Sequence, residues 1–431
     1  MLAAMVDAFR QPDLRARILF TFALLVVFRF VAHIPVPGVD VAAMNRFFQG
    51  NALLGMLDLF TGGAMRNLSV AAMGVYPYIT ATIIMQLMVP VIPSLERMSK
   101  EGEQGRAQIN RISIWMTIPL AALQAYAQLF VFQRAGVIPG FGLTGENLLP
   151  TLAMVVSMTA ATIFLVWLGE LITQHGIGNG ISIVIFAGIV ASLPQLLGQS
   201  FLQAGGNLSG LLVFFVVGFL IVLFIVIFTE AQRRIPVQYG KTLFRGGQVR
   251  RVGGSTYIPL RVNSAGMIPL IFAISIMILP GTIASYFIGM QPAWVSNTAD
   301  LVRRIFDFNS VFYQTLYFLL VVAFAFFYTI VIFQQQNLAE NLQKNGGFIP
   351  GIRPGRPTQD YLIRVITRIT WGGALFLGLV AIAPYIATLF TGVQGLQLSS
   401  TGLLIVVGVV LDTLRQLEAQ LLMRHYEGFI R

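Results

Sequence analysis

The sequence of 431 residues contains no cysteine, and only 10% of its residues are charged. The lack of cysteine excludes disulfide bonds and thiolate metal sites. The low charge content is unlike that of a soluble domain, in which about a quarter of the residues are charged. Hydrophobic residues instead make up 56% of the chain. This length and composition predict a multi-pass membrane protein with room for about ten spans.

The sequence also lacks the motifs of common enzymes. The histidines His33, His175 and His425 lie far apart in the chain, and there is no Walker A, HExxH or GxSxG motif. The GIGNG run does not fit a GxGxxG fingerprint, and we expect a tight turn there with Asn179 as a helix N-cap. No predicted span has an acidic residue near its middle, although Arg29 lies near the end of the first. We therefore expect no enzyme activity and no cofactor, and a coupled solute transporter is disfavoured.

Ten apolar segments predict an all-α membrane protein. The predicted spans are 18–36, 73–91, 112–132, 149–172, 180–197, 211–228, 265–288, 311–333, 370–390 and 401–422. A short linker near residue 205 leaves five spans on each side, so the predicted halves are 1–205 and 206–431. An odd number of spans inverts the second half relative to the first. In such inverted repeats the pathway lies between the halves.

Lys and Arg concentrate in the loops on one side of the predicted spans. The positive-inside rule assigns that side, and both termini, to the cytoplasm. Two loops there, 230–262 and 334–362, carry more bases than topology needs. The first alternates basic and apolar residues, with Gly-Gly pairs at 246–247 and 253–254 as turn points, and so predicts a hairpin. In the second, NGG at 345–347 is expected to end a helix. Both loops suit docking of an acidic partner, and simple solvation is the alternative.

The segment 57–88 combines a poor membrane span with a good one. Its first part carries Gly62, Gly63, Arg66 and Asn67, and it runs straight into an apolar helix. Irregular backbone at membrane depth is tolerated only where protein or water covers it. One interpretation is therefore a segment that faces an interior cavity. A surface loop followed by an ordinary helix is the other, and the residues alone leave both open.

Motifs spread over nearly the whole chain carry a family resemblance. They are FRFVAHIPVPGVD (28–40), MGVYPYITATIIMQL (73–87), EGEQGR (101–106), HGIGNGISIVIFAGIV (175–190), RRIPVQYGK (233–241), STYIPLRVNSAGMIPLIFA (255–273) and NGGFIPGIRPG (345–355). Together they resemble the SecY family, the central subunits of the bacterial protein-translocation channel. The resemblance implies a channel in the bacterial cytoplasmic membrane that passes unfolded secretory polypeptides and releases transmembrane segments laterally into lipid. The alternative is an inverted-repeat secondary transporter for a small solute.

The resemblance also implies a set of site residues. A hydrophobic pore ring would consist of Val75, Ile79, Ile181, Ile185, Ile271 and Ile405. A plug segment, residues 57–69, would close the external funnel with Phe60, Thr61, Gly62, Gly63, Met65, Arg66 and Asn67. The helices at 73–91 and 265–288 would flank a lateral gate, with Gln86 and Asn263 as its polar pair. Docking of partners would use Arg245, Arg250, Arg251, Arg353 and Arg356.

The partners that the resemblance implies are SecE-like and SecG-like small membrane subunits, the SecA motor ATPase and the ribosome. Signal sequences and unfolded polypeptides would be the substrates. Because the chain has no nucleotide-binding motif, a bound partner would have to supply the energy. An aliphatic ring suits this role, since it deforms around a substrate and dewets when it is empty. A signal sequence that replaces contacts between gate helices would shift the closed–open equilibrium.

Overall fold

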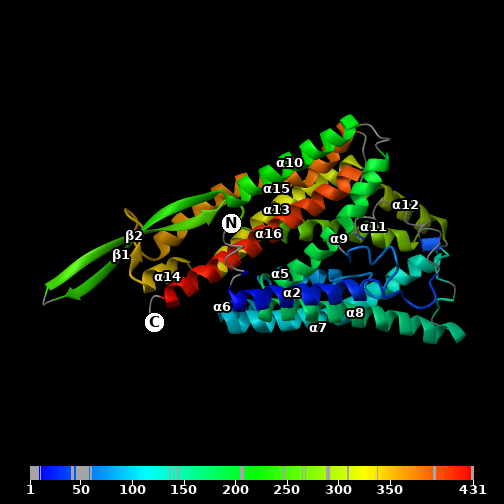
Figure 1. The fold of residues 1–431 in the computed structure, drawn as a ribbon, viewed down its shortest axis with the longest axis horizontal. Helices are drawn as coiled ribbons and strands as arrows, with labels where there is room; N and C mark the ends of the chain where they lie inside the picture. Colours follow the sequence, from blue (N-terminus) through cyan, green and yellow to red (C-terminus); the bar gives the residue numbers. More distant parts are fainter. Residues whose placement is uncertain are drawn as a thin grey trace. The chain divides into compact units, whose positions relative to one another are not determined.

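The computed structural model shows a mostly helical chain (Figure 1). It describes residues 9, 11–39, 43–44, 58, 61–134, 136–138, 140–142, 145–203, 208–245, 248–264, 266, 268–287, 292–307, 310–336, 338–391 and 395–428.

Each of the ten predicted spans overlaps a helix, with bounds that differ by a few residues. The helices are α2 (Pro12–Val31), α5 (Tyr76–Met88), α7 (Glu103–Arg134), α8 (Leu148–His175), α9 (Gly180–Gln203), α10 (Leu208–Glu230), α11 (Ile268–Phe287), α13 (Val311–Gln336), α15 (Arg356–Thr391) and α16 (Gly395–Gly428). Within the described ranges, 4 helices are long and apolar enough to cross a membrane by themselves, namely α7, α8, α13 and α15. A fifth is obtained if α5 is joined to α6 (Pro93–Lys100) across a bend of 98°. The chain is a multi-pass membrane protein, and crossing by all ten helices stays a prediction.

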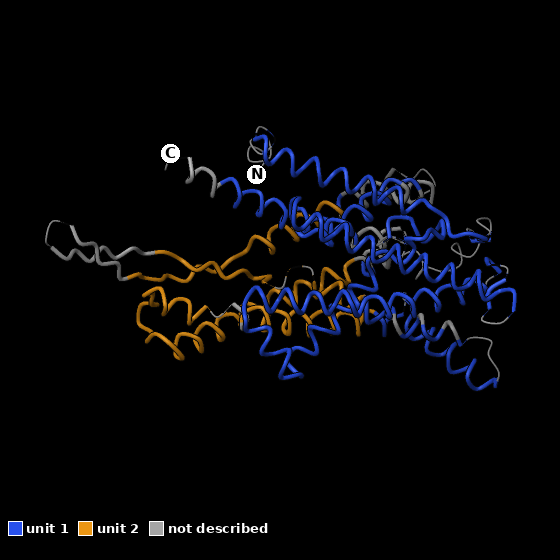
Figure 2. Tube along the Cα trace, turned by 90° about the horizontal axis from the view of Figure 1, so that it is seen from below, with its two compact units in different colours: residues 1–216, 275–313, 384–431 blue, residues 217–274, 314–383 orange. Residues whose placement is uncertain are grey.

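The chain divides into two compact units (Figure 2). Unit 1 comprises Met1–Val216, Ser275–Tyr313 and Pro384–Arg431, and unit 2 comprises Val217–Ile274 and Gln314–Ala383. The predicted division into halves at residue 205 addresses a different property, the internal repeat, and stays a prediction.

Unit 1 is built around α8. Helices α2, α7 and α9 pack on α8, while α5 packs on α7 and α16 packs on α9. One buried cluster joins residues of α7 and α8, such as Leu129 and Met158, to Met65 and Leu68 of the plug segment. Burial of such side chains contributes about 1.5–3 kcal/mol each. The plug segment is therefore part of the core of unit 1 and not a surface loop.

The turn between α8 and α9 forms as the sequence predicts. The backbone N–H of Ser182 donates to Oδ1 of Asn179 at 3.2 Å, so Asn179 is the N-cap of α9. Gly178 has φ +77°, a left-handed conformation that favours glycine. A Cβ on Gly180 would lie 1.8 Å from the carbonyl oxygen of Gly169 on α8. The absence of a side chain at Gly180 is thus what lets α9 begin directly against α8.

The predicted hairpin is present in unit 2. Strands β1 (Gln232–Arg245) and β2 (Gln248–Arg261) pair in antiparallel fashion (Figure 1). The prediction that the Gly-Gly pair at 253–254 forms a turn is wrong. These two glycines lie inside β2, opposite Gly240 and Tyr239, because pairing with β1 is continuous on both sides of them. The pair at 246–247 lies outside the described residues.

The second basic loop joins the hairpin through a short strand. Helix α14 (Leu338–Lys344) ends before the NGG run as predicted, and Gly346 has φ +67°. Strand β3 (Gly347–Phe348) then pairs with β1, which gives a sheet of order β2-β1-β3. A Cβ on Gly347 would lie 2.8 Å from the Tyr239 ring, so glycine permits this close pairing. Ile349, which directly follows β3, packs in one buried cluster with residues of β1, β2 and α15.

Aromatic and glycine contacts join described membrane helices of unit 2. Phe228 of α10 stacks on Phe376 of α15, with ring centroids 3.9 Å apart. A Cβ on Gly378 of α15 would lie 2.6 Å from the Phe318 ring on α13. Glycine therefore lets α13 and α15 approach closely, which is how many membrane helices associate.

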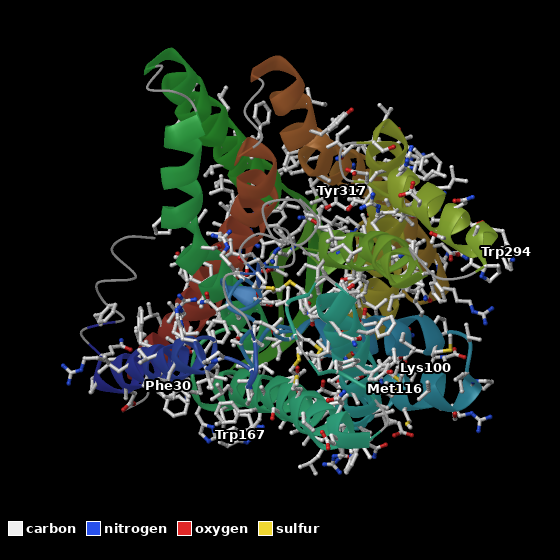
Figure 3. The ribbon with its side chains drawn as sticks, turned by 90° about the vertical axis from the view of Figure 1, so that its right-hand side faces the viewer. Phe30, Lys100, Met116, Trp167, Trp294 and Tyr317 are labelled. Carbon is white, nitrogen blue, oxygen red and sulfur yellow. The ribbon has the colours of Figure 1, made fainter. Side chains whose placement is uncertain are left out.

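Large apolar side chains project from the outside of several helices. Phe30 of α2, Trp167 of α8 and Trp294 of α12 (Ala293–Ile305) are 70%, 51% and 70% exposed (Figure 3). A soluble protein rarely exposes so many large apolar groups in contiguous patches. These exposed apolar side chains fit a lipid environment.

Candidate functional site

The plug segment forms tight turns at residues 62–68, and turns continue after it from 70 to 75. The glycine pair predicts that any helix here is weak. Among the described residues, 58 and 61 are helical and 62–68 form turns. Gly62 and Gly63 have φ values of +69° and +84°, which a right-handed helix does not accommodate. The predicted plug residue Phe60 lies outside the described residues.

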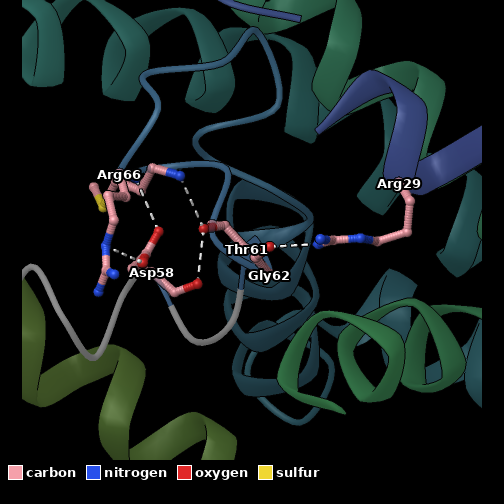
Figure 4. A network of polar contacts seen from close by, with 6 residues as sticks. Arg29, Asp58, Thr61, Gly62 and Arg66 are labelled. Atoms are coloured by element: carbon pink, nitrogen blue, oxygen red, sulfur yellow. Dashed lines mark hydrogen bonds and ion pairs between the residues drawn. The ribbon is translucent and has the colours of Figure 1, made fainter. Parts of the chain in front are cut away.

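A polar network holds these turns together (Figure 4). The backbone N–H of Arg66 donates to Oδ1 of Asp58 at 2.9 Å, and its Nε lies 3.5 Å from Oδ2. The hydroxyl of Thr61 donates to the Asp58 carbonyl at 3.1 Å and accepts from the N–H of Met65 at 3.3 Å. Burial raises the pKa of the Asp58 carboxyl, and the backbone N–H and guanidinium of Arg66 oppose that rise. The raised pKa means that acidification favours this buried conformation over a solvated one.

The far end of the plug segment is tied to the chain that follows α2. Pro35 and Ser69 form an isolated antiparallel bridge. The N–H of Val36 donates to the carbonyl of Leu68, and the N–H of Val70 donates to that of Ile34, both at 2.9 Å. The segment is therefore anchored at its C-terminal end by backbone hydrogen bonds.

The near end of the segment rests on glycines beside the predicted pore ring. A Cβ on Gly62 would lie 2.8 Å from Cα of Gly188 on α9, three residues after Ile185. A Cβ on Gly74 would lie 3.3 Å from Cγ2 of Thr61, and Gly74 directly precedes the predicted ring residue Val75. Residues three or four apart share a helix face, so the plug segment covers the α9 face that carries Ile185.

Arg29 contacts the plug segment from a third side. Its Nη1 donates to the carbonyl oxygen of Gly62 at 2.5 Å (Figure 4). Arg29 lies in the last turn of α2, where a cation also complements the helix dipole. The sequence marked Arg29 only as a charged residue near the end of a span. Nothing in the sequence pattern relates it to Gly62, which is distant in the chain.

The predicted ring residues occupy different environments. Val75, Ile79, Ile185 and Ile405 are buried, at 3%, 8%, 3% and 1% exposure. Ile181 is half-buried, and its Cδ1 would lie 2.5 Å from a Cβ on Gly169 of α8. These five belong to unit 1, in which α9 packs on α16.

Ile271 and the two predicted gate residues complete the membrane part of the predicted site. Ile271 is half-buried on α11 in unit 2. Gln86 on α5 belongs to unit 1, and Asn263, which is 7% exposed, belongs to unit 2. Oε1 of Gln86 and Oδ1 of Asn263 are both buried and accept no hydrogen bond from any described residue. A buried amide oxygen without a donor is costly, at about 1–3 kcal/mol.

The predicted docking residues all lie in unit 2. Arg353 is exposed, and its carbonyl accepts from the buried Thr358 hydroxyl at 2.8 Å. Arg356, also exposed, is the first residue of α15. The side chains of Arg245, Arg250 and Arg251, toward the tip of the hairpin, lie outside the described part of the structure. The two basic loops, 230–262 and 334–362, meet where β3 pairs with β1.

Comparison with known proteins identifies the family. The family model described as SecY matches residues 69–414. The chain belongs to the SecY family. Among curated relatives, the protein translocase subunit SecY of Streptomyces scabiei is 43% identical, and all of both chains is covered. The protein of the same name from Thermotoga maritima is 42% identical and covers 100% of this chain and 98% of its own.

Solved structures show the same fold at lower identity. One is a SecY channel whose plug domain stabilises the closed state and maintains a membrane seal. It is 19% identical, has a TM-score of 0.64, and covers 94% of this chain and 91% of its own. Another is Sec61 from a canine ribosome–channel complex of the endoplasmic reticulum, which is 17% identical with a TM-score of 0.61 and the same coverage. The predicted SecY-family membrane fold is thus confirmed.

Proposed function

We propose that this chain is the central subunit of a protein-conducting channel of the bacterial cytoplasmic membrane. It passes unfolded secretory polypeptides across that membrane and releases transmembrane segments laterally into it. The observation that carries this proposal is the contact of the plug segment with glycines beside ring residues, Gly62 on Gly188 and Thr61 beside Gly74. A segment of turns that covers buried aliphatic side chains is suited to seal a pore and to leave it. A small-solute transporter is not favoured, since the curated relatives are translocase subunits.

The other parts of the predicted site have proposed roles in the same channel. Gln86 and Asn263 form the polar pair of the lateral gate, and each has a buried amide oxygen able to accept a hydrogen bond in another arrangement of the gate. The exposed arginines of unit 2 dock the ribosome or the SecA motor, which supplies the energy. SecE-like and SecG-like subunits complete the channel, both termini are cytoplasmic, and the chain itself is no enzyme.

A disulfide cross-link tests the proposed function directly, because the chain has no native cysteine. Ile79→Cys would be paired with a single cysteine in the middle of a stalled secretory polypeptide, in membranes that contain the motor or the ribosome. We expect a disulfide that depends on the signal sequence. Ala121→Cys on α7, which is 0% exposed, is the control and should form none. Absence of the bond at position 79, with uptake of small solutes instead, would favour the transporter.

Replacement of Ile185 by Asn is expected to weaken the closed channel. Ile185 is 3% exposed, and a buried amide without partners costs about 1–3 kcal/mol. If the open state hydrates this position, the open fraction rises roughly tenfold or more. Export of a reporter with a defective signal sequence measures the change. Ile185→Val keeps the aliphatic surface and should behave like the parent. Full signal stringency in the Ile185→Asn variant would remove Ile185 from the ring.

A further inference from the structure

We infer that Arg29 is the latch of the plug: its guanidinium holds the carbonyl of Gly62, and release of this hydrogen bond is a step in opening. The inference rests on the proposed channel function and adds to it the residue that controls the closed state. Arg29 acts as a positioning residue, because it holds the backbone of the plug segment and contacts no substrate.

The contact between Arg29 and Gly62 is charge-assisted and short. Nη1 of Arg29 lies 2.5 Å from the Gly62 carbonyl oxygen. Hydrogen bonds with an ionised donor are roughly twice as strong as neutral ones. The guanidinium is only partly exposed, so it would lose a protein acceptor there without full compensation from water. Arg29 is therefore the charged group placed to stabilise the plug segment at the end opposite its backbone bridge.

Gly62 is held between two helices. A Cβ on this residue would lie 3.2 Å from Nη1 of Arg29 and 2.8 Å from Cα of Gly188. The plug backbone thus lies between the cation of α2 and the bare backbone of α9. Gly62 has φ +69°, a left-handed backbone conformation that favours glycine, and its carbonyl accepts from Arg29 in this conformation. A movement of Gly62 away from Arg29 would break this hydrogen bond.

The N-terminal part and the middle of α2 contact the α8–α9 turn and α16, which gives Arg29 a rigid support. The hydroxyl oxygen of Thr21 accepts the N–H of Ile177, in the α8–α9 turn, at 3.3 Å. Leu14 and Ile18 pack in one buried cluster with Ile177 and with Leu417 of α16. A displacement of α2 relative to α9 would therefore move Arg29 relative to the plug.

The experiment uses the complete channel with its small subunits, reconstituted in liposomes without a polypeptide substrate. Arg29→Met removes the donors and keeps an unbranched side chain. Arg29→Lys keeps the positive charge at the end of α2 but has a shorter reach and no planar fork. Arg15→Met, at an exposed position at the other end of the same helix, is the matched control. The first readout is potassium flux through the resting channel.

The second readout is labelling by a membrane-impermeant maleimide at Ala64→Cys, a position in the plug segment that is 0% exposed in the structure. Loss of one charge-assisted hydrogen bond should raise both resting flux and labelling roughly tenfold in Arg29→Met. Arg29→Lys should show flux and labelling between those of the parent and Arg29→Met. Arg15→Met should match the parent in both. Ala121→Cys reports general packing and should stay unlabelled in every variant.

Two results would contradict the proposed role of Arg29. One is parental flux and labelling in Arg29→Met. The other is full recovery by Arg29→Lys, which would assign Arg29 to the helix dipole of α2 instead. If Ala121→Cys becomes labelled in Arg29→Met, that variant is misfolded and Arg29→Lys decides. The parent is first tested for the signal-dependent cross-link at Ile79→Cys. If the parent forms the cross-link and Arg29→Met stays sealed, only the proposed role of Arg29 is wrong. If the parent forms no cross-link, the proposed channel function is wrong.

Discussion

Replacement of Gly180 by alanine is expected to prevent the chain from reaching its folded state. The added methyl group would lie 1.8 Å from the carbonyl oxygen of Gly169 and 2.9 Å from Cβ of Ile172. Both neighbours belong to α8, and the nearest atom is backbone, which no rotamer change can move away. Separation of α9 from α8 would also disturb Ile181 and Ile185 and the contact of the plug with Gly188. A destabilisation of about 4 kcal/mol or more is the scale for such overlaps in a core.

Gly198→Ala provides the matched control for this prediction. Gly198 lies on the same helix, and a Cβ there would meet no atom within 4 Å. The substitution should be neutral or slightly stabilising, since alanine favours helix by about 1 kcal/mol over glycine. The yield of intact protein in the membrane fraction, and its resistance to protease, measure both variants. Parental yield and protease resistance in Gly180→Ala would mean that α8 and α9 do not pack as closely as described.

The features that the sequence predicts well are those fixed by short-range signals. Each long apolar run overlaps a helix, since hydrophobicity dominates the placement of membrane helices. Asn179 was recognised as an N-cap because a side-chain oxygen before a helix satisfies a free backbone N–H. The hairpin followed from alternation of basic and apolar residues. The Gly-Gly pair at 253–254 wrongly predicts a turn, because the same dipeptide occurs both in turns and in long paired strands.

The features that the sequence does not predict depend on contacts between distant residues. The hydrogen bond of Arg29 to Gly62 joins two residues that no local pattern relates to each other. Pairing of β3 with β1 involves only two residues of β3, too few for a recognisable strand pattern. A glycine pair predicts that a helix is weak, but only tertiary contacts select positive φ at both positions. The roles of the ring residues came from family resemblance, since a buried isoleucine on a helix has no distinctive local signature.

Reversal of the charge at Arg353 is expected to reduce motor-driven export strongly while leaving the channel intact in the membrane. The side chain is exposed, so Arg353→Glu disturbs no packing. Its backbone is held firmly, because the carbonyl accepts from the Thr358 hydroxyl and Ile349 anchors the preceding turn in a buried cluster. A rigid, projecting arginine can dock an acidic partner with little loss of conformational entropy.

Loss of a charge-assisted contact costs about 1.5–3 kcal/mol, and a carboxylate at the same place adds repulsion. Export of a secretory reporter by the motor should therefore fall by about tenfold or more. The matched control is Arg97→Glu on α6, an exposed position in unit 1 with the same change of charge, which should export at the parental rate. Because both variants alter the positive-inside balance equally, a defect confined to position 353 separates docking from topology. Equal export by the two variants would leave the basic loops of unit 2 as topology signals alone.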